Sequence, residues 1–128
     1  MTALTLAAVA AGGAAGAVAR YLTMSAVGAL VGVGFPYGTL TVNVVGSFVL
    51  GVLVELGAQI WSPAPELRAM LVVGFLGAFT TFSTFSLDVI VLIERKTYGP
   101  AAAYVAASVV LSVAALFAGM RLMRGLLG

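Results

Sequence analysis

The sequence contains no cysteine and no histidine, and only six basic and four acidic residues among 128. Without cysteine and histidine there is no disulfide, no thiolate nucleophile, no imidazole base and none of the usual side chains for a transition metal. Soluble domains are about 25% charged, whereas this chain is 8% charged and 62% hydrophobic. A soluble fold of this length cannot bury so much apolar surface, so the composition indicates an integral membrane protein.

The polar residues also lack the arrangements that enzymes and nucleic-acid-binding proteins require. We find no nucleophile–base pair, no phosphate-binding loop and no cluster of metal ligands. The net charge of +2 comes from few, scattered residues, which do not form a nucleic-acid surface. Apolar and polar residues do not alternate as they do along the strands of a membrane β-barrel. We therefore expect an all-α membrane protein that is not an enzyme.

The sequence does contain four apolar runs, each long enough to cross a bilayer as a helix. The segments GALVGVGFPYG, WSPAPE and ERKTYGP separate these runs as loops or turns. Sixteen glycines fit this interpretation, because small residues let membrane helices approach closely. The chain, residues 1–128, is expected to form one domain with spans at residues 3–27, 39–60, 67–93 and 101–120.

The basic residues do not give a clear orientation in the membrane. One side would hold the N-terminus, the second loop and the C-terminus, with Arg68, Arg121 and Arg124. The other side would hold Arg95 and Lys96, and also Arg20 if it lies near the end of its span. This balance leaves open a fixed topology set by one or two charges, or insertion in both orientations with an antiparallel dimer. Four short spans do not easily enclose an ion path, which favours an oligomer.

Polar side chains within spans are costly and are therefore candidates for function. In the fourth span, Tyr104, Ser108 and Ser112 follow one another at intervals of four, which on a helix gives a ladder of hydroxyls about 12 Å long. Such hydroxyls either bond to carbonyls of their own helix or line a polar track, and the alignment of three favours the track. Asn43, in the second span, is either a hydrogen-bond donor between helices or a donor to a ligand.

The segment GAFTTFSTFS, residues 77–86, carries five hydroxyl side chains and a phenylalanine at every third position. Glycine lowers helix propensity, and serine and threonine compete for backbone hydrogen bonds. We therefore expect a broken third helix near residues 77–81, whose freed carbonyls suit a hard cation such as Na⁺. On one helix the three rings would fan over about a third of a turn. They either face lipid and core or present their edges to an anion.

The spans hold no titratable group near their centres. Proton-coupled carriers need such a group, and Glu55 and Asp88 lie away from the middle of their spans, so their positions indicate no role. The residues alone therefore describe a small four-span protein with neutral hydrogen-bond donors along a narrow path. Such donors suit a small dehydrated anion, which the spacing of the residues does not name.

Three segments resemble the signature motifs of the Fluc, or CrcB-type, fluoride channels. They are GGAAGAVARY at 12–21, PYGTLTVNVVGSFVLG at 36–51 and GFLGAFTTFSTFS at 74–86, and the resemblance covers essentially the whole chain. It implies an antiparallel, dual-topology homodimer with two fluoride pathways. It also implies passive and selective export of fluoride through the inner membrane of a microbial cell, which relieves the toxicity of fluoride that entered as HF.

The resemblance further implies roles for individual residues. The fluoride pathway would include Thr39, Asn43, Phe82, Phe85, Tyr104, Ser108 and Ser112. The backbone carbonyls of Gly77 and Thr80 from both subunits would hold a central structural Na⁺. Arg20 matches the arginine of the family's first span, with a structural or electrostatic role.

Two alternatives remain open at the level of sequence. A proton-coupled exporter of the small multidrug-resistance type is also a short four-span, dual-topology dimer. That class needs a carboxylate in its first span, and residues 1–28 contain none. The second alternative is a membrane assembly subunit, in which the hydroxyls only hold helices together.

Overall fold

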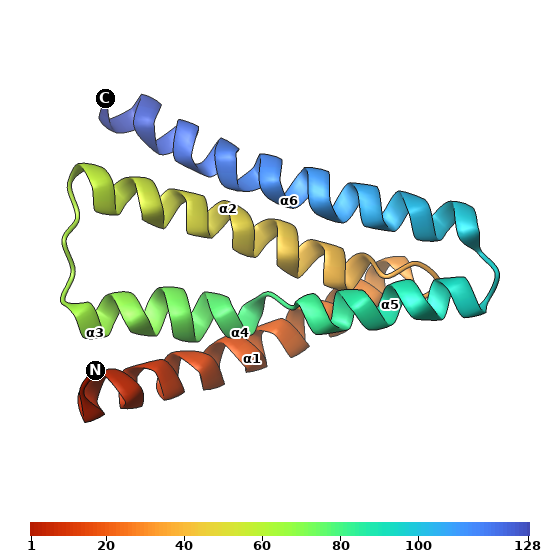
Figure 1. Cartoon of the computed structure of the whole chain (residues 1–128), viewed down its shortest axis with the longest axis horizontal. Coiled ribbons are helices and arrows are strands. Elements are labelled where there is room, and N and C mark those ends of the chain that lie inside the picture. The colour runs from red at the N-terminus through yellow and green to blue at the C-terminus, as the bar shows by residue number, and fades with distance from the viewer.

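The computed structural model describes residues 1–128, and its regular elements are all helices (Figure 1). Its helices are α1 (Ala3–Val31), α2 (Tyr37–Gln59), α3 (Pro65–Arg68), the π-helix η1 (Ala69–Leu76), α4 (Gly77–Phe79), α5 (Phe82–Glu94) and α6 (Tyr98–Leu127). The segment from α3 to α5, Pro65–Glu94, is one stretch of membrane-spanning length, so four segments are long and apolar enough to cross a bilayer. The prediction of an all-α protein with four membrane-length segments is confirmed.

The four segments run alternately up and down (Figure 1). The N-terminus, the C-terminus and the connection between α2 and α3 lie at one end, and the other two connections lie at the opposite end. The helices pack mainly as two pairs, α2 with α6 and α1 with η1 and α4.

Glycines allow the backbones of α2 and α6 to touch. A Cβ atom built on Gly51 would fall on the carbonyl oxygen of Leu116, and one built on Gly119 would fall on that of Phe48. Such reciprocal contacts are the small-residue packing expected between membrane helices. They fix the distance between α2 and α6, and with it the position of the polar residues of α6.

The third segment leaves helical geometry at two residues while remaining one bent, connected stretch. α4 ends at Phe79, and Thr80 (φ −87°, ψ 156°) and Thr81 (φ −151°, ψ 117°) are extended before α5 begins at Phe82. The side-chain oxygen of Thr81 accepts a hydrogen bond from the backbone N–H of Thr84 at 3.1 Å, which makes Thr81 the N-cap of α5.

This interruption separates the three phenylalanines that a continuous helix would place on one side. Phe79 is buried and stacks on Phe75, with ring centroids 6.0 Å apart. Phe82 and Phe85 lie on α5, with centroids 5.5 Å apart, and Phe82 is 78% exposed. The expected common fan of three rings is therefore wrong, because the extended peptides at residues 80–81 turn Phe79 away from the other two.

The ends of α2 and α6 are joined by a buried carboxylate. Arg124 donates to both carboxylate oxygens of Glu55, through Nε at 3.2 Å and Nη2 at 3.1 Å, and Gln59 donates a third hydrogen bond at 3.0 Å. Glu55 is only 4% exposed, so its charge is compensated within the protein. The structure thus gives Glu55, which had no role from sequence, a place in holding α6 against α2.

Candidate functional site

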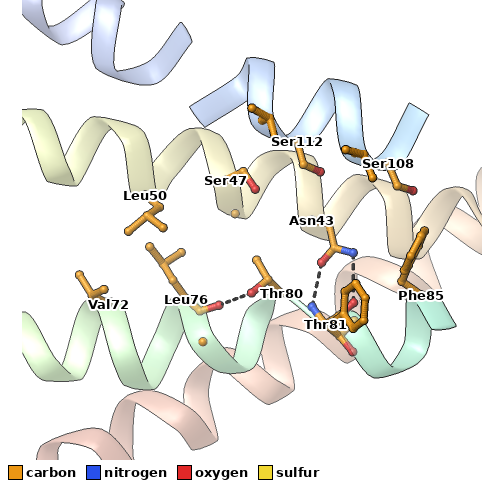
Figure 2. A pocket seen from close by; sticks show the side chains of 15 residues that line it. Asn43, Ser47, Leu50, Val72, Leu76, Thr80, Thr81, Phe85, Ser108 and Ser112 are labelled. Carbon is orange, nitrogen blue, oxygen red and sulfur yellow. Dashed lines mark hydrogen bonds between the residues drawn. The ribbon is translucent and has the colours of Figure 1, made fainter. Parts of the chain in front are cut away.

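A cavity of about 420 Å³ lies between α2, the third segment and α6. Figure 2 shows α2 and α6 on one side of it and the interruption of the third segment on the other. Its polar and aromatic lining residues are Asn43, Ser47, Thr80, Thr81, Phe82, Phe85, Ser108 and Ser112. The cavity therefore gathers polar groups from three segments that are far apart in sequence.

Asn43 binds the interrupted backbone with both ends of its amide (Figure 2). Its Oδ1 accepts a hydrogen bond from the N–H of Thr81 at 2.8 Å, and its Nδ2 donates to the carbonyl oxygen of Thr81 at 3.1 Å. The amide nitrogen carries two hydrogens, so one remains for another acceptor. Asn43 is thus both a clamp on the extended backbone and a residue that lines the cavity.

The interruption deprives the carbonyl groups of residues 77–80 of their helical donors, and those of Gly77 and Thr80 are among them. In a continuous helix the N–H of Thr81 would bond to the carbonyl of Gly77, and the N–H of Thr84 to that of Thr80. Here the first N–H donates to Asn43 and the second to the side chain of Thr81. Gly77 and Thr80, both of which line the cavity, are therefore suited to offer carbonyl oxygens to a cation.

Arg20 supports the same interruption from α1. Its Nε donates to the carbonyl oxygen of Ala78 at 2.9 Å. Ala78 is the middle residue of α4, close to the centre of the third segment. The Arg20 guanidinium therefore lies near the middle of the membrane-length segments and belongs to neither loop, which settles a position that the sequence left open.

We expect Arg20→Gln to lower the free energy of unfolding by about 1.5–3 kcal/mol, because a hydrogen bond from a charged group to a part-buried carbonyl is lost. The midpoint of thermal unfolding in detergent is the measurement. Arg95→Gln is the matched control, because Arg95 is exposed and follows the end of α5. Equal midpoints for the two variants would show that the bond to Ala78 contributes nothing.

Ser108 and Ser112 are the clearest unpaired polar groups of the site. The Oγ atoms of both are buried and have no hydrogen-bond partner in the chain. Neither hydroxyl therefore bonds to its own helix, which was the alternative that the sequence left open. Figure 2 shows both side chains on α6, opposite the interruption. Two buried hydroxyls that line a cavity without partners can donate to a bound ligand.

Tyr104 and Thr39 do not line the cavity, but each lies one helical turn before a residue that does, Ser108 and Asn43 respectively. Both are almost completely buried, with exposures of 0% and 2%. The Tyr104 hydroxyl donates to Oδ2 of Asp88 at 2.9 Å, and the ring lies 5.2 Å from that of Phe85 between centroids. Phe35, from the loop before α2, meets the Tyr104 ring edge-on at 5.6 Å.

The structure thus brings most of the predicted site residues around one cavity. Sequence reasoning missed Thr81, the partner of Asn43, and Asp88, the partner of Tyr104. A threonine directly before the first residue of an apolar helix is a common N-cap, and this signal could have identified Thr81. The contact between Asp88 and Tyr104 joins residues 16 apart on different helices, and no local signal indicates it.

Comparison with known proteins gives consistent matches along the chain. A family model described as "CrcB-like protein, Camphor Resistance (CrcB)" matches residues 7–120. The "Fluoride-specific ion channel FluC" of Rhodospirillum centenum is 64% identical over 117 residues, which cover 91% of this chain and 93% of the relative. The protein of the same name from Agrobacterium fabrum is 52% identical over 123 residues, covering 96% and 98%. The similarity includes all four membrane-length segments.

Proposed function

This chain belongs to the CrcB-like, or Fluc, family, and we propose on that premise that it is a passive, selective fluoride channel of a bacterial inner membrane. The names of its relatives describe an ion channel, so the chain is a multi-pass membrane protein and not an enzyme. Its role would be to let fluoride leave the cytoplasm down its own gradient.

The observation that carries the proposal is the pair of unpartnered hydroxyls of Ser108 and Ser112. They face the same cavity as the amide of Asn43, which has a hydrogen to spare. Neutral donors stabilise an anion that has lost its water without holding it as tightly as a fixed positive charge would. Together with buried Thr39, these groups form the polar side of the proposed fluoride path, and Tyr104, whose hydroxyl donates to Asp88, flanks it.

Phe82 and Phe85 supply the other side of the path. Ring edges carry partial positive charge and can face an anion. Phe85 lies beside Tyr104, while Phe82 is mostly exposed although it lines the cavity. A path bounded by Phe82 is therefore incomplete within one subunit, which supports an antiparallel homodimer with two pathways.

The charge distribution supports insertion in both orientations. Arg20 lies at the depth of Ala78 and therefore counts for neither end. One end of the structure then has three basic residues, Arg68, Arg121 and Arg124, and the other has two, Arg95 and Lys96. The positive-inside rule counts these residues, and a difference of one gives only a weak bias between the two orientations.

We assign the freed carbonyls of Gly77 and Thr80 as ligands of a structural Na⁺ shared between the two subunits. A bound cation would compensate the partial negative charges of these carbonyl oxygens where the two interrupted segments meet. Asn43 and the cap residue Thr81 keep these carbonyls out of helical hydrogen bonds. The structure of a dimer that showed no density between the two interruptions would remove this assignment.

The test is fluoride efflux from liposomes that contain the purified protein, with chloride as the control anion. We expect the double variant Ser108→Ala/Ser112→Ala to lower efflux by roughly 10- to 100-fold, because two hydrogen bonds of about 0.5–1.5 kcal/mol each are lost from the path. Thr23→Val is the control, since the Thr23 hydroxyl bonds to the Ala19 carbonyl of its own helix at 2.8 Å.

Three results would count against the proposal. Absence of fluoride flux in the unmodified protein would exclude the channel, and unchanged flux in the double variant would remove the two serines from the path. Proton-dependent efflux of an organic cation would favour the multidrug exporter instead.

A further inference from the structure

A second cavity, which shares only Val72 with the cavity of the proposed ion path, lies between the C-terminal half of α2 and the start of the third segment. Its volume is about 590 Å³, and eight of its eleven lining residues are hydrophobic. Leu53 and Val54 of α2 line it together with Val72 and Val73 of η1. Because α2 packs mainly on α6, and η1 mainly on α1, this cavity is the seam between the two pairs of helices.

Arg68 is the only charged residue among those that line the cavity. A Cβ atom on Gly57 would lie 3.1 Å from Nη2 of Arg68, so the guanidinium reaches from the end of α3 to the surface of α2. The one ion pair of the chain joins Arg124 to Glu55. The positive charge of Arg68 is therefore uncompensated, although it lies beside an apolar cavity.

Trp61 places this end of the cavity at the membrane surface. It lies in the connection between α2 and α3 and lines the same cavity. Tryptophan and arginine gather at the level of lipid headgroups. The cavity thus combines a cationic end at the headgroup level with apolar walls that continue toward the bilayer interior, which matches the phosphate and acyl chain of a phospholipid.

We propose that this cavity binds one anionic phospholipid per subunit, with its phosphate on Arg68 and an acyl chain between α2 and η1. The phosphate oxygens accept charge-assisted hydrogen bonds from the guanidinium. A second copy of the chain is the other candidate occupant. Its packing over the cavity would bury the Arg68 charge without a partner, which is costly, so the lipid is favoured.

The experiment uses Trp61, the single tryptophan of the chain, as a fluorescent reporter. The protein is reconstituted with phosphatidylglycerol or phosphatidylcholine that carries brominated acyl chains, which quench a tryptophan they touch. We expect half-maximal quenching at about fivefold lower mole fraction of phosphatidylglycerol than of phosphatidylcholine, the preference that one interfacial arginine provides.

Three variants and one competitor identify the source of this preference. Arg68→Gln should abolish it and Arg68→Lys should restore part of it. Arg121→Gln should leave it unchanged, because Arg121 is exposed at the same end of the structure but does not line the cavity. Inorganic phosphate at constant ionic strength should not reverse it.

Several outcomes would overturn the proposal. Equal quenching by the two lipids in the unmodified protein, or an undiminished preference in Arg68→Gln, would show that Arg68 does not select an anionic lipid. Reversal by inorganic phosphate would indicate a site for the free ion. Absence of quenching by either lipid would show that a second copy covers the cavity.

Discussion

Replacing Asn43 with alanine should lower fluoride efflux by roughly 10- to 100-fold. Two losses combine in this variant. The donor that faces the cavity disappears, and the N–H and carbonyl groups of Thr81 lose the amide that holds the backbone extended. The N–H of Thr81 is then free to bond to the Gly77 carbonyl, which would extend α4 into the interruption.

Asn43→Asp separates the two contributions. The carboxylate keeps an oxygen in place of Oδ1, which accepts from Thr81, but it replaces the Nδ2 donor with negative charge. We expect this variant to abolish fluoride efflux while retaining the proposed dimer and more of the thermal stability than Asn43→Ala. Efflux from proteoliposomes, size-exclusion chromatography and thermal unfolding in detergent are the three measurements. Efflux at the unmodified rate in either variant would place Asn43 outside the ion path.

Gly119→Ala should destabilise the fold by about 1–3 kcal/mol, although alanine is intrinsically the better helix former. The added Cβ would fall on the Phe48 carbonyl oxygen and lie 3.0 Å from the backbone nitrogen of Val52. Backbone atoms have no alternative rotamer, so relief requires α6 to move away from α2. That movement would displace Ser108 and Ser112, so we expect fluoride efflux to fall together with stability.

Gly125→Ala is the matched control for this prediction. Both glycines lie in α6, but a Cβ on Gly125 would have no atom within 4 Å. We expect it to leave efflux unchanged and to raise stability slightly, by up to about 1 kcal/mol. The midpoint of thermal unfolding should therefore fall in Gly119→Ala and stay level or rise in Gly125→Ala, and fluoride efflux should fall only in Gly119→Ala. Equal midpoints and equal efflux in the two variants would refute close packing at Gly119.

Local sequence was sufficient to predict two features of the candidate site, the helix face that carries Ser108 and Ser112 and the interruption of the third segment. The spacing of Ser108 and Ser112 predicted a shared helix face, because helix periodicity depends only on chain position. The glycines and hydroxyls of residues 77–81 indicated weak helical preference, and the extended residues Thr80 and Thr81 lie in that stretch. Periodicity did not reveal that Phe79 turns into the core, because it assumes that the helix continues.

The sequence by itself determined that this is an all-α membrane protein with four membrane-length segments and without the residue patterns of an enzyme. Composition and hydropathy depend only on the order of residues, so they can be evaluated without knowing which segments are in contact. Only the tertiary structure decided which polar groups are paired. Asn43 binds Thr81 across 38 positions, Arg20 binds Ala78 across 58, and Arg124 binds Glu55 across 69. These pairings depend on how closely the helices pack, and they leave the Ser108 and Ser112 hydroxyls without a partner.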